Sequence, residues 1–271
     1  MNSMIRLIAL DIDGVISKSR GGFYAGRIIN LLAQLNDMAA RSRASVSASI
    51  NGNGSIDSNS RVLPPVTVIT GRPATYVESL LQAIHGFAPA VFEHGTGIYN
   101  PEGYTFKSHP DLVCLDELSE LKNIINVSFV KKGLAVLQGG KDYSLSVISR
   151  DRNITGKLKD MILEAGGELC RKFDFIYSSD SLNIIPAGFH KGKGIEMLAD
   201  EAGVPLESIL GVGDSEVDIP FMEKTGFSAA PANAGEAVKV TADYVSELTL
   251  SEGLEDILRH FCLIPVPITA P

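Results

Sequence analysis

Short apolar runs that end at polar turns recur along the chain. They cover residues 7–10, 66–70, 89–92, 208–212 and 227–230. Such runs are typical of buried strands in a parallel sheet. Apolar side chains spaced three or four residues apart predict helices at residues 25–41, 75–84, 190–202 and 251–261. Because these strands and helices alternate, we expect an α/β fold built on a parallel sheet.

Residues 108–183 follow a different pattern, in which strands no longer alternate regularly with helices. We expect helices at residues 111–125 and 154–164, and strands at residues 134–137, 143–148, 173–177 and 182–185. This order is typical of an antiparallel sheet with helices on one face. We therefore predict a parallel-sheet core formed by residues 1–107 and 184–271, into which residues 108–183 are inserted as an α+β unit.

A third type of composition occupies residues 42–60, which are rich in Ser, Asn and Gly. A segment with so few large apolar side chains buries too little surface to offset the entropy that ordering costs. We expect a flexible insertion here. It lies between the first helix and the second strand, so we expect it at the end of the sheet opposite the carboxyl ends of the strands.

The overall composition is that of a globular protein, with 45% hydrophobic and 21% charged residues in a chain of 271. The net charge of −8 argues against a nucleic-acid partner, which needs a basic surface. No apolar stretch resembles a secretory signal or reaches the roughly 20 residues of a membrane span. Cys114, Cys170 and Cys262 are odd in number and widely spaced, which suits a reducing compartment. We expect a cytoplasmic protein without a nucleic-acid or membrane partner.

The first apolar run ends at two carboxylates, Asp11 and Asp13, followed by Gly14. In a parallel sheet this position is the carboxyl end of a strand, where open α/β sheets bind their ligands. Residues two apart in a strand project to the same face, so the two carboxylates repel each other unless a cation joins them. A divalent ion such as Mg²⁺ meets this need and leaves coordination sites for a phosphate. An ordinary strand-ending turn is the alternative.

The second run ends in Thr70-Gly71-Arg72-Pro73. Parallel pairing with the first strand predicts that Thr70 lies level with Asp11, where its hydroxyl and the Gly71 amide can bind a phosphate oxygen. An ordinary helix start, with Thr70 as the cap and Pro73 in the first turn, explains the same residues.

Two further segments carry charge at positions that match this edge of the sheet. Lys191 and Lys193 begin a helix, where the macrodipole disfavours a cation and an anionic partner would compensate, although either can be a surface lysine. The run at residues 208–212 ends in Gly213-Asp214-Ser215-Glu216-Val217-Asp218, so carboxylates again follow a strand. This recurrence indicates one site to which Asp214 and Asp218 also belong.

The order and types of these residues resemble the haloacid dehalogenase-like phosphatase superfamily. Its four motifs are an Asp-x-Asp strand end, a Thr or Ser strand end, a Lys, and a Gly-Asp-x-x-x-Asp turn. Residues 231–234 and 242–245 also resemble the Cof-like branch and its archaeal-type phosphoglycolate phosphatases. The resemblance implies a Rossmann-like core with a large α+β cap.

For the site, the resemblance implies that Asp11 is the nucleophile and Asp13 the general acid and base. It implies a Mg²⁺ site of Asp11, Asp13 and Asp214, assisted by Asp218. We expect the substrate phosphate to contact Thr70, Gly71, Arg72 and Lys191. These roles agree with the chemistry, because a carboxylate nucleophile divides one difficult hydrolysis into two easier steps. Positive charge and hydrogen-bond donors then neutralise the transferring phosphoryl oxygens.

Three departures from the motif pattern stand out. Val217 stands where relatives commonly have Asn, and His94 replaces the Asn of a Glu-Asn-Gly turn. The Ser/Asn/Gly segment at residues 42–60 is not part of the usual pattern.

The leading interpretation is a Mg²⁺-dependent phosphatase that hydrolyses phosphoglycolate, a sugar phosphate or another small phosphorylated metabolite. A phosphomutase or phosphotransferase acting on a sugar phosphate is the enzymatic alternative. A metabolite-binding protein without activity is the other alternative, although the presence of Asp13 argues against it, since binding alone does not need a second carboxylate.

Overall fold

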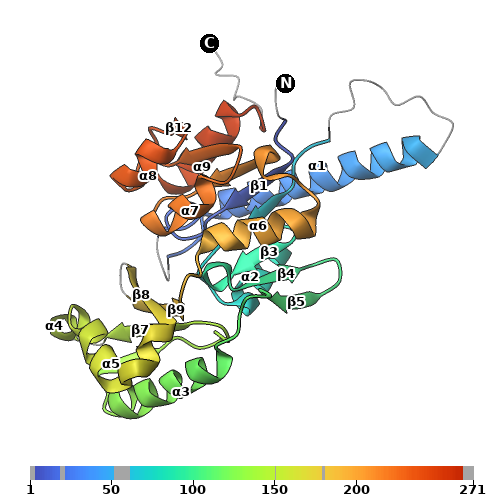
Figure 1. The fold of residues 1–271 in the computed structure, drawn as a ribbon. Helices are drawn as coiled ribbons and strands as arrows, with labels where there is room; N and C mark the ends of the chain where they lie inside the picture. The colour runs from blue at the N-terminus through green and yellow to red at the C-terminus, as the bar shows by residue number, and fades with distance from the viewer. Residues whose placement is uncertain (1–3, 19–21, 52–61, 150, 179–180, 265–271) are drawn as a thin grey trace.

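The computed structural model describes residues 4–18, 22–51, 62–149, 151–178 and 181–264. These residues form two lobes (Figure 1). The larger lobe contains both ends of the described chain and a parallel sheet, and the smaller lobe contains the middle of the chain. No helix within the described ranges is long and apolar enough to cross a membrane.

The larger lobe is built on a five-stranded sheet in the order β12-β11-β10-β1-β2, with every pair parallel. Its strands are β1 (Leu7–Leu10), β2 (Val66–Val68), β10 (Ile209–Val212), β11 (Phe227–Ala230) and β12 (Tyr244–Val245). The strands β1, β2 and β10 are buried along their whole length. Burial on both faces explains why they read as continuous apolar runs in the sequence.

Helices cover both faces of this sheet. One face packs against α1 (Gly26–Asn51), α2 (Ala74–Ala83) and α9 (Leu250–His260), and the other packs against α6 (Lys191–Ala202), α7 (Ile219–Met222) and α8 (Glu236–Thr241). In β1, Ile8 and Leu10 face the first group of helices, and Leu7 and Ala9 face the second. The predicted α/β class with a parallel-sheet core is therefore confirmed.

A small antiparallel sheet extends the larger lobe next to β2. It consists of β3 (Ala90–Phe92), β4 (Gly97–Asn100) and β5 (Thr105–Ser108), and Ile69 and Val91 form one parallel bridge between β2 and β3. A short 3-10 turn, Glu93–Gly95, joins β3 to β4.

The smaller lobe, residues 115–186, is an α+β unit with its own hydrophobic core. Its antiparallel sheet has the order β6-β7-β9-β8. The strands are β6 (Ala135–Leu137), β7 (Leu145–Ser149), β8 (Phe173–Ser178) and β9 (Ser181–Pro186), and the helices are α3 (Leu115–Ile125), α4 (Arg152–Thr155) and α5 (Leu158–Gly166). A π-helical turn, Asn126–Val130, follows α3, and a 3-10 segment, Gly167–Lys172, follows α5. The predicted α+β character of this part of the chain is borne out.

The prediction of a flexible segment at residues 42–60 is wrong for its first ten residues, because α1 continues to Asn51. Ala and Arg favour a helix, and no Gly or Pro interrupts the chain before Gly52. The hydroxyls of Ser42 and Ser45 donate hydrogen bonds to the preceding turn, which keeps these polar residues compatible with the helix. Residues 52–60 lie outside the described residues.

Two smaller differences concern element bounds. The strand β12 was not predicted, and α3 begins at Leu115 and not at residue 111. The segment before Leu115 connects the two lobes, and the amide of His109 donates to the Thr96 carbonyl.

We predict that Ile162→Ala lowers the free energy of unfolding by ~2–5 kcal/mol, because Ile162 is fully buried in the core of the α+β unit and truncation leaves a cavity. Hydrogen exchange should increase mainly within residues 115–186. Val240→Ala, at an exposed position on α8, is the control and should change little. An equal loss of protection in β1 and β10 would contradict a separate core for the α+β unit.

Candidate active site

A cavity of about 520 Å³ lies at the carboxyl end of the parallel sheet, between the two lobes. The larger lobe contributes Asp11, Asp13, Gly14, Lys18, Gly71, Arg72, His94, Lys191, Asp214, Ser215, Glu216 and Val217. The α+β unit contributes Ile176, Tyr177, Ser178 and Asn183. Most of the residues expected from the sequence therefore line one cavity, although Thr70 and Asp218 are buried behind its wall.

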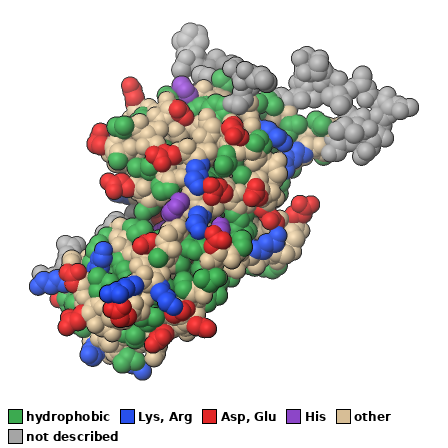
Figure 2. All heavy atoms as spheres, viewed as in Figure 1, with side chains coloured by type: hydrophobic (Ala, Val, Ile, Leu, Met, Phe, Trp, Pro, Cys, Tyr) green, Lys and Arg blue, Asp and Glu red, His purple; other side chains and the backbone are tan. Residues whose placement is uncertain are grey.

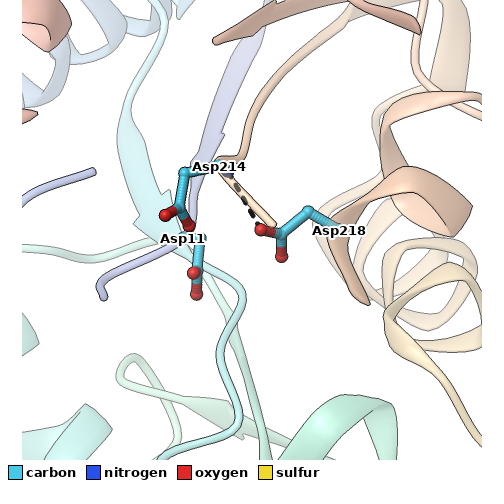
Figure 3. A group of neighbouring side chains, drawn as sticks. All are labelled: Asp11, Asp214 and Asp218. Carbon is cyan, nitrogen blue, oxygen red and sulfur yellow. Dashed lines mark hydrogen bonds between the residues drawn. The ribbon is translucent and has the colours of Figure 1, made fainter. Parts of the chain in front are cut away.

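Three carboxylates meet at the floor of this cavity. Asp11 follows β1 and Asp214 follows β10, and these strands are hydrogen-bonded neighbours with Leu10 opposite Val212. One oxygen from each of Asp11, Asp214 and Asp218 lies within 4.8 Å of the others. Figure 3 shows the carboxylates converging, with the Asp214 amide bonded to Asp218. Residues separated by two hundred positions in sequence are thus brought together by parallel pairing.

Lys191, at the first turn of α6, supplies the positive charge for this group. Its Nζ donates to Asp11 Oδ1 at 2.7 Å and to Asp218 Oδ1 at 2.5 Å. Its side chain is only 2% exposed. Burial opposes the charged form, but the charges of Asp11 and Asp218 outweigh burial and raise the pKa of Lys191 above its ordinary value. The two carboxylates therefore favour the charged form of Lys191.

The second oxygen of Asp218 shapes the turn after β10. Asp218 Oδ2 accepts hydrogen bonds from the amides of Asp214 and Ser215, each at 3.0 Å, and from the Ser215 hydroxyl at 2.9 Å. Both Asp218 oxygens are therefore used within the protein. This side chain positions Lys191 and the Asp214 backbone.

Of the three carboxylates, Asp214 is the one that most lacks a partner for its oxygens. Its Oδ1 is buried and forms no hydrogen bond within the described part of the chain. Burial and the charge of Asp218 raise the pKa of Asp214 to about 7. Burial also raises the pKa of Asp11 well above its ordinary value, against the opposing charge of Lys191. Crowded carboxylates with an unpaired buried oxygen are a donor set that fits a hard divalent cation.

Gly14 makes this close packing possible. Its φ is +90°, and a Cβ at this position would lie 1.8 Å from Asp214 Oδ2. The Asn233 side chain donates to the Gly14 carbonyl at 2.9 Å and so fixes the turn from the other side.

Asp13 forms an ion pair with Arg72 that the sequence did not predict. Arg72 donates to both of its oxygens, through Nε at 2.8 Å and Nη2 at 2.5 Å. The Arg72 guanidinium also lies over the Tyr76 ring at 4.7 Å. Asp13 is not among the three carboxylates grouped within 4.8 Å of one another, although its charge adds to burial in raising the pKa values of Asp11 and Asp214. Arg72 orients Asp13 and also lines the cavity, where contact with a substrate phosphate stays a prediction.

Thr70 lies one residue further along than expected. Since Leu10 pairs with Val68, Ile69 is next to Asp11 and Thr70 follows it. The Thr70 hydroxyl accepts a hydrogen bond from the Arg72 amide at 3.1 Å. Gly71 lines the cavity and packs under His94, because a Cβ on Gly71 would lie 2.3 Å from His94 Cε1.

The sequence did not indicate the residues that the α+β unit contributes. Asn183 and Ser178 belong to a partly buried hydrogen-bond network with Ser146 and Ser181 on neighbouring strands. These are common residue types in strands, and only the packing of one lobe on the other brings them to the cavity.

We predict that Lys191→Met lowers the free energy of unfolding by ~3–5 kcal/mol, because it leaves two buried carboxylates without a counter-charge. Urea unfolding at neutral pH measures this change. Lys193→Met on the same helix is the matched control, with an expected loss of at most ~1 kcal/mol, since Lys193 pairs with the exposed Asp111. Equal losses in the two variants would be evidence against the buried charge pairs.

We also predict that Asp214→Asn stabilises the metal-free protein at pH 8 by on the order of 1–4 kcal/mol, and less at pH 5. The pKa of Asp214 is about 7 in the folded protein, so folding favours its protonated form. The wild-type protein therefore loses stability as the pH rises towards 7, and an amide removes this loss. Unfolding in the presence of a chelator, with Glu216→Gln as the exposed control, tests this expectation. A destabilised variant at pH 8 would contradict it.

Comparison with known proteins shows which family this chain resembles. A family model described as haloacid dehalogenase-like hydrolase matches residues 146–258. A phosphoglycolate phosphatase of Thermoplasma volcanium is 27% identical over 264 residues, which cover 96% of this chain and 100% of that protein. Another phosphoglycolate phosphatase, of Methanothrix thermoacetophila, is 37% identical over 87 residues, which cover 32% of this chain and 39% of that protein.

Solved structures share the fold. A Thermoplasma acidophilum protein superposes with a TM-score of 0.69 at 21% identity, covering 96% of this chain and 100% of its own. A haloacid dehalogenase-like hydrolase from Bacteroides thetaiotaomicron also has a TM-score of 0.69, at 18% identity, with coverage of 94% and 99%. In sequence and fold this chain is similar to haloacid dehalogenase-like hydrolases, and a relative of the same length is named phosphoglycolate phosphatase.

Proposed function

We propose that this phosphatase depends on Mg²⁺ and hydrolyses a small phosphorylated metabolite through an aspartyl-phosphate at Asp11. The observation that carries this proposal is the buried group of Asp11, Lys191, Asp214 and Asp218 at the end of the parallel sheet, open to a cavity. Phosphoglycolate and sugar phosphates are the proposed substrates. Full-length relatives named phosphoglycolate phosphatase and a fold neighbour named as a sugar phosphatase support these two classes.

In the first step, a carboxylate oxygen of Asp11 attacks phosphorus and the bond between phosphorus and the leaving oxygen breaks. Burial raises the pKa of Asp11, and the charge of Lys191 opposes that shift, so Lys191 favours the ionised nucleophile and offsets the negative charges that an anionic substrate meets. The Gly71 amide and Lys191 are placed to contact the phosphoryl oxygens as charge develops on them.

Asp13 is the proposed proton donor and acceptor. It gives its proton to the leaving oxygen and takes a proton from the water that attacks the aspartyl-phosphate, which releases phosphate and restores Asp11. The two hydrogen bonds from Arg72 orient this carboxylate for both transfers.

Asp11 and Asp214 are the proposed principal ligands of Mg²⁺, since Asp218 and Asp13 use their oxygens within the protein. When bound, this ion supplies positive charge next to the phosphoryl group.

We further propose that residues 108–183 act as a cap on a core of residues 1–107 and 184–271. Its cavity-lining side chains are uncharged within the described residues, and Ser178 and Asn183 can hydrogen-bond to the leaving group. Closure of such a unit excludes water from the reaction.

Acidic and basic side chains are interspersed on the face that Figure 2 shows, which fits a small-molecule partner. Cysteines 114, 170 and 262 are free, which supports a reducing compartment such as the cytoplasm.

A panel of phosphorylated metabolites assayed with Mg²⁺ tests this function. We expect phosphate release from the wild-type protein, its loss on chelation, and its return when Mg²⁺ is restored. Asp11→Asn should reduce release to background, and Asp13→Asn should slow it by ~10²–10⁴-fold. Asp111→Asn, at an exposed position, is the control.

Three results would contradict the proposal. Turnover by Asp11→Asn would exclude Asp11 as the nucleophile. An isomerised phosphate ester in place of free phosphate would indicate a mutase. No turnover of any phosphate ester would indicate a binding protein.

A further inference from the structure

Glu93, which follows β3 in the larger lobe, makes a buried connection to the α+β unit. Its side chain has no solvent exposure. Oε1 accepts a hydrogen bond from the Asp142 amide at 3.0 Å, and Oε2 accepts from the Tyr143 amide at 3.0 Å and the Ser144 hydroxyl at 2.8 Å. All three donors belong to the loop between β6 and β7. One carboxylate of the larger lobe therefore binds a loop of the other lobe.

This loop, residues 139–144, also packs directly on the larger lobe. Tyr143 stacks on Phe92 with ring centroids 5.9 Å apart and an interplanar angle of 19°. Gly140 has a φ of +81°, and a Cβ on it would lie 3.6–3.8 Å from Thr75 and Pro73. The loop thus contacts the helix start that follows Arg72, next to the cavity.

The turn that carries Glu93 is strained. Glu93, His94 and Gly95 have φ values of +46°, +64° and +97°. Left-handed conformations are costly for residues with a side chain and concentrate at functional sites. The turn is fixed to the cavity wall, because the amides of Glu93 and His94 donate to the carbonyls of Arg72 and Thr70, each at 3.0 Å. The Glu93 side chain faces the loop, while the adjacent His94 ring lies on Gly71 and lines the cavity.

Burial of this carboxylate is costly without its partners. Burial raises the pKa of Glu93, whereas the loop hydrogen bonds and the charge of Lys141 act in the opposite direction. All of these compensating groups come from the α+β unit, at residues 141–144. Undocking of the loop would leave Glu93 without them, so the docked arrangement is strongly preferred.

We propose that Glu93 is a positioning residue for the phosphatase reaction. Glu93 docks loop 139–144 of the α+β unit on the turn 93–95. This docking orients His94 and the cavity-lining hairpin of the α+β unit relative to Asp11. This inference rests on the proposed function. It concerns recognition of the leaving group, because Ile176, Tyr177, Ser178 and Asn183 lie on the lobe that Glu93 fixes. The chemistry at phosphorus depends on the other lobe.

The test compares Glu93→Gln with Ser144→Ala and with Glu255→Gln. The amide in Glu93→Gln keeps the size of the side chain but turns an acceptor into a donor that faces an amide of the loop. Ser144→Ala removes one of the three donors from the loop side. Glu255→Gln is the matched control, since Glu255 is also a buried carboxylate, but it pairs with Arg27 and Arg259 on α1 and α9.

Steady-state kinetics with two substrates distinguish an effect of Glu93 on leaving-group recognition from an effect on the chemistry at phosphorus. Acetyl phosphate presents little beyond the phosphoryl group, and a hexose 6-phosphate presents a large leaving group. For Glu93→Gln we expect KM for the hexose phosphate to rise about tenfold, with kcat for acetyl phosphate changed less than about twofold. Ser144→Ala should show the same pattern to a smaller degree, and Glu255→Gln should not show it. Equal effects on the two substrates, or no effect on either, would overturn the proposal.

Hydrogen exchange tests docking independently of activity. Glu93→Gln should increase exchange in residues 139–144 and also in residues 93–96, while β10 and α9 stay protected. An increase confined to residues 139–144 would show a local loop contact and would overturn the positioning role. If the wild-type protein hydrolyses neither substrate, the proposed function fails, and the exchange result still decides whether Glu93 docks the loop.

Discussion

The buried interaction of Lys191 with Asp11 and Asp218 is the constraint on which the site depends. Three carboxylates meet where β1 and β10 end, and their repulsion would open this edge of the sheet without a buried cation. Lys191 supplies that charge from the first turn of α6. The compensation is partial, since Asp214 Oδ1 has no protein partner within the described residues. Lys191 thus compensates part of the negative charge, and the unpaired Asp214 oxygen remains as a donor that fits a cation.

Separate carboxylates serve separate purposes around this centre. Asp218 uses both of its oxygens to fix Lys191 and the turn after β10, and Asp13 is fixed by Arg72. Asp11 and Asp214 retain capacity for a ligand. The Glu93 turn then connects the cavity wall to the α+β unit, so under the proposed function the residues for phosphoryl transfer and those for the leaving group come from different lobes.

The sequence predicted the α/β class and most residues at the cavity floor for one physical reason. Parallel strands end at one edge of a sheet, so polar residues such as Asp11 and Asp214 that follow apolar runs must meet there. The pairing of Asp13 with Arg72 depends on side-chain geometry that spacing does not encode. Glu93 and Asn183 were missed because their roles arise from docking of one lobe on the other. The helix at residues 42–51 was missed because serine composition concealed a run without helix breakers.

The most direct test of the account is chemical trapping of the phosphoenzyme. Wild-type protein is mixed with substrate and Mg²⁺, quenched in acid and reduced with borohydride, which converts an aspartyl-phosphate to homoserine. The account predicts homoserine at position 11 in peptide mass spectra, dependent on substrate and absent from Asp11→Asn. Homoserine at another aspartate would contradict it. An unmodified Asp11 would also contradict it, if the sample is quenched during rapid turnover and the same procedure traps the phosphoenzyme of a known aspartyl-phosphate enzyme.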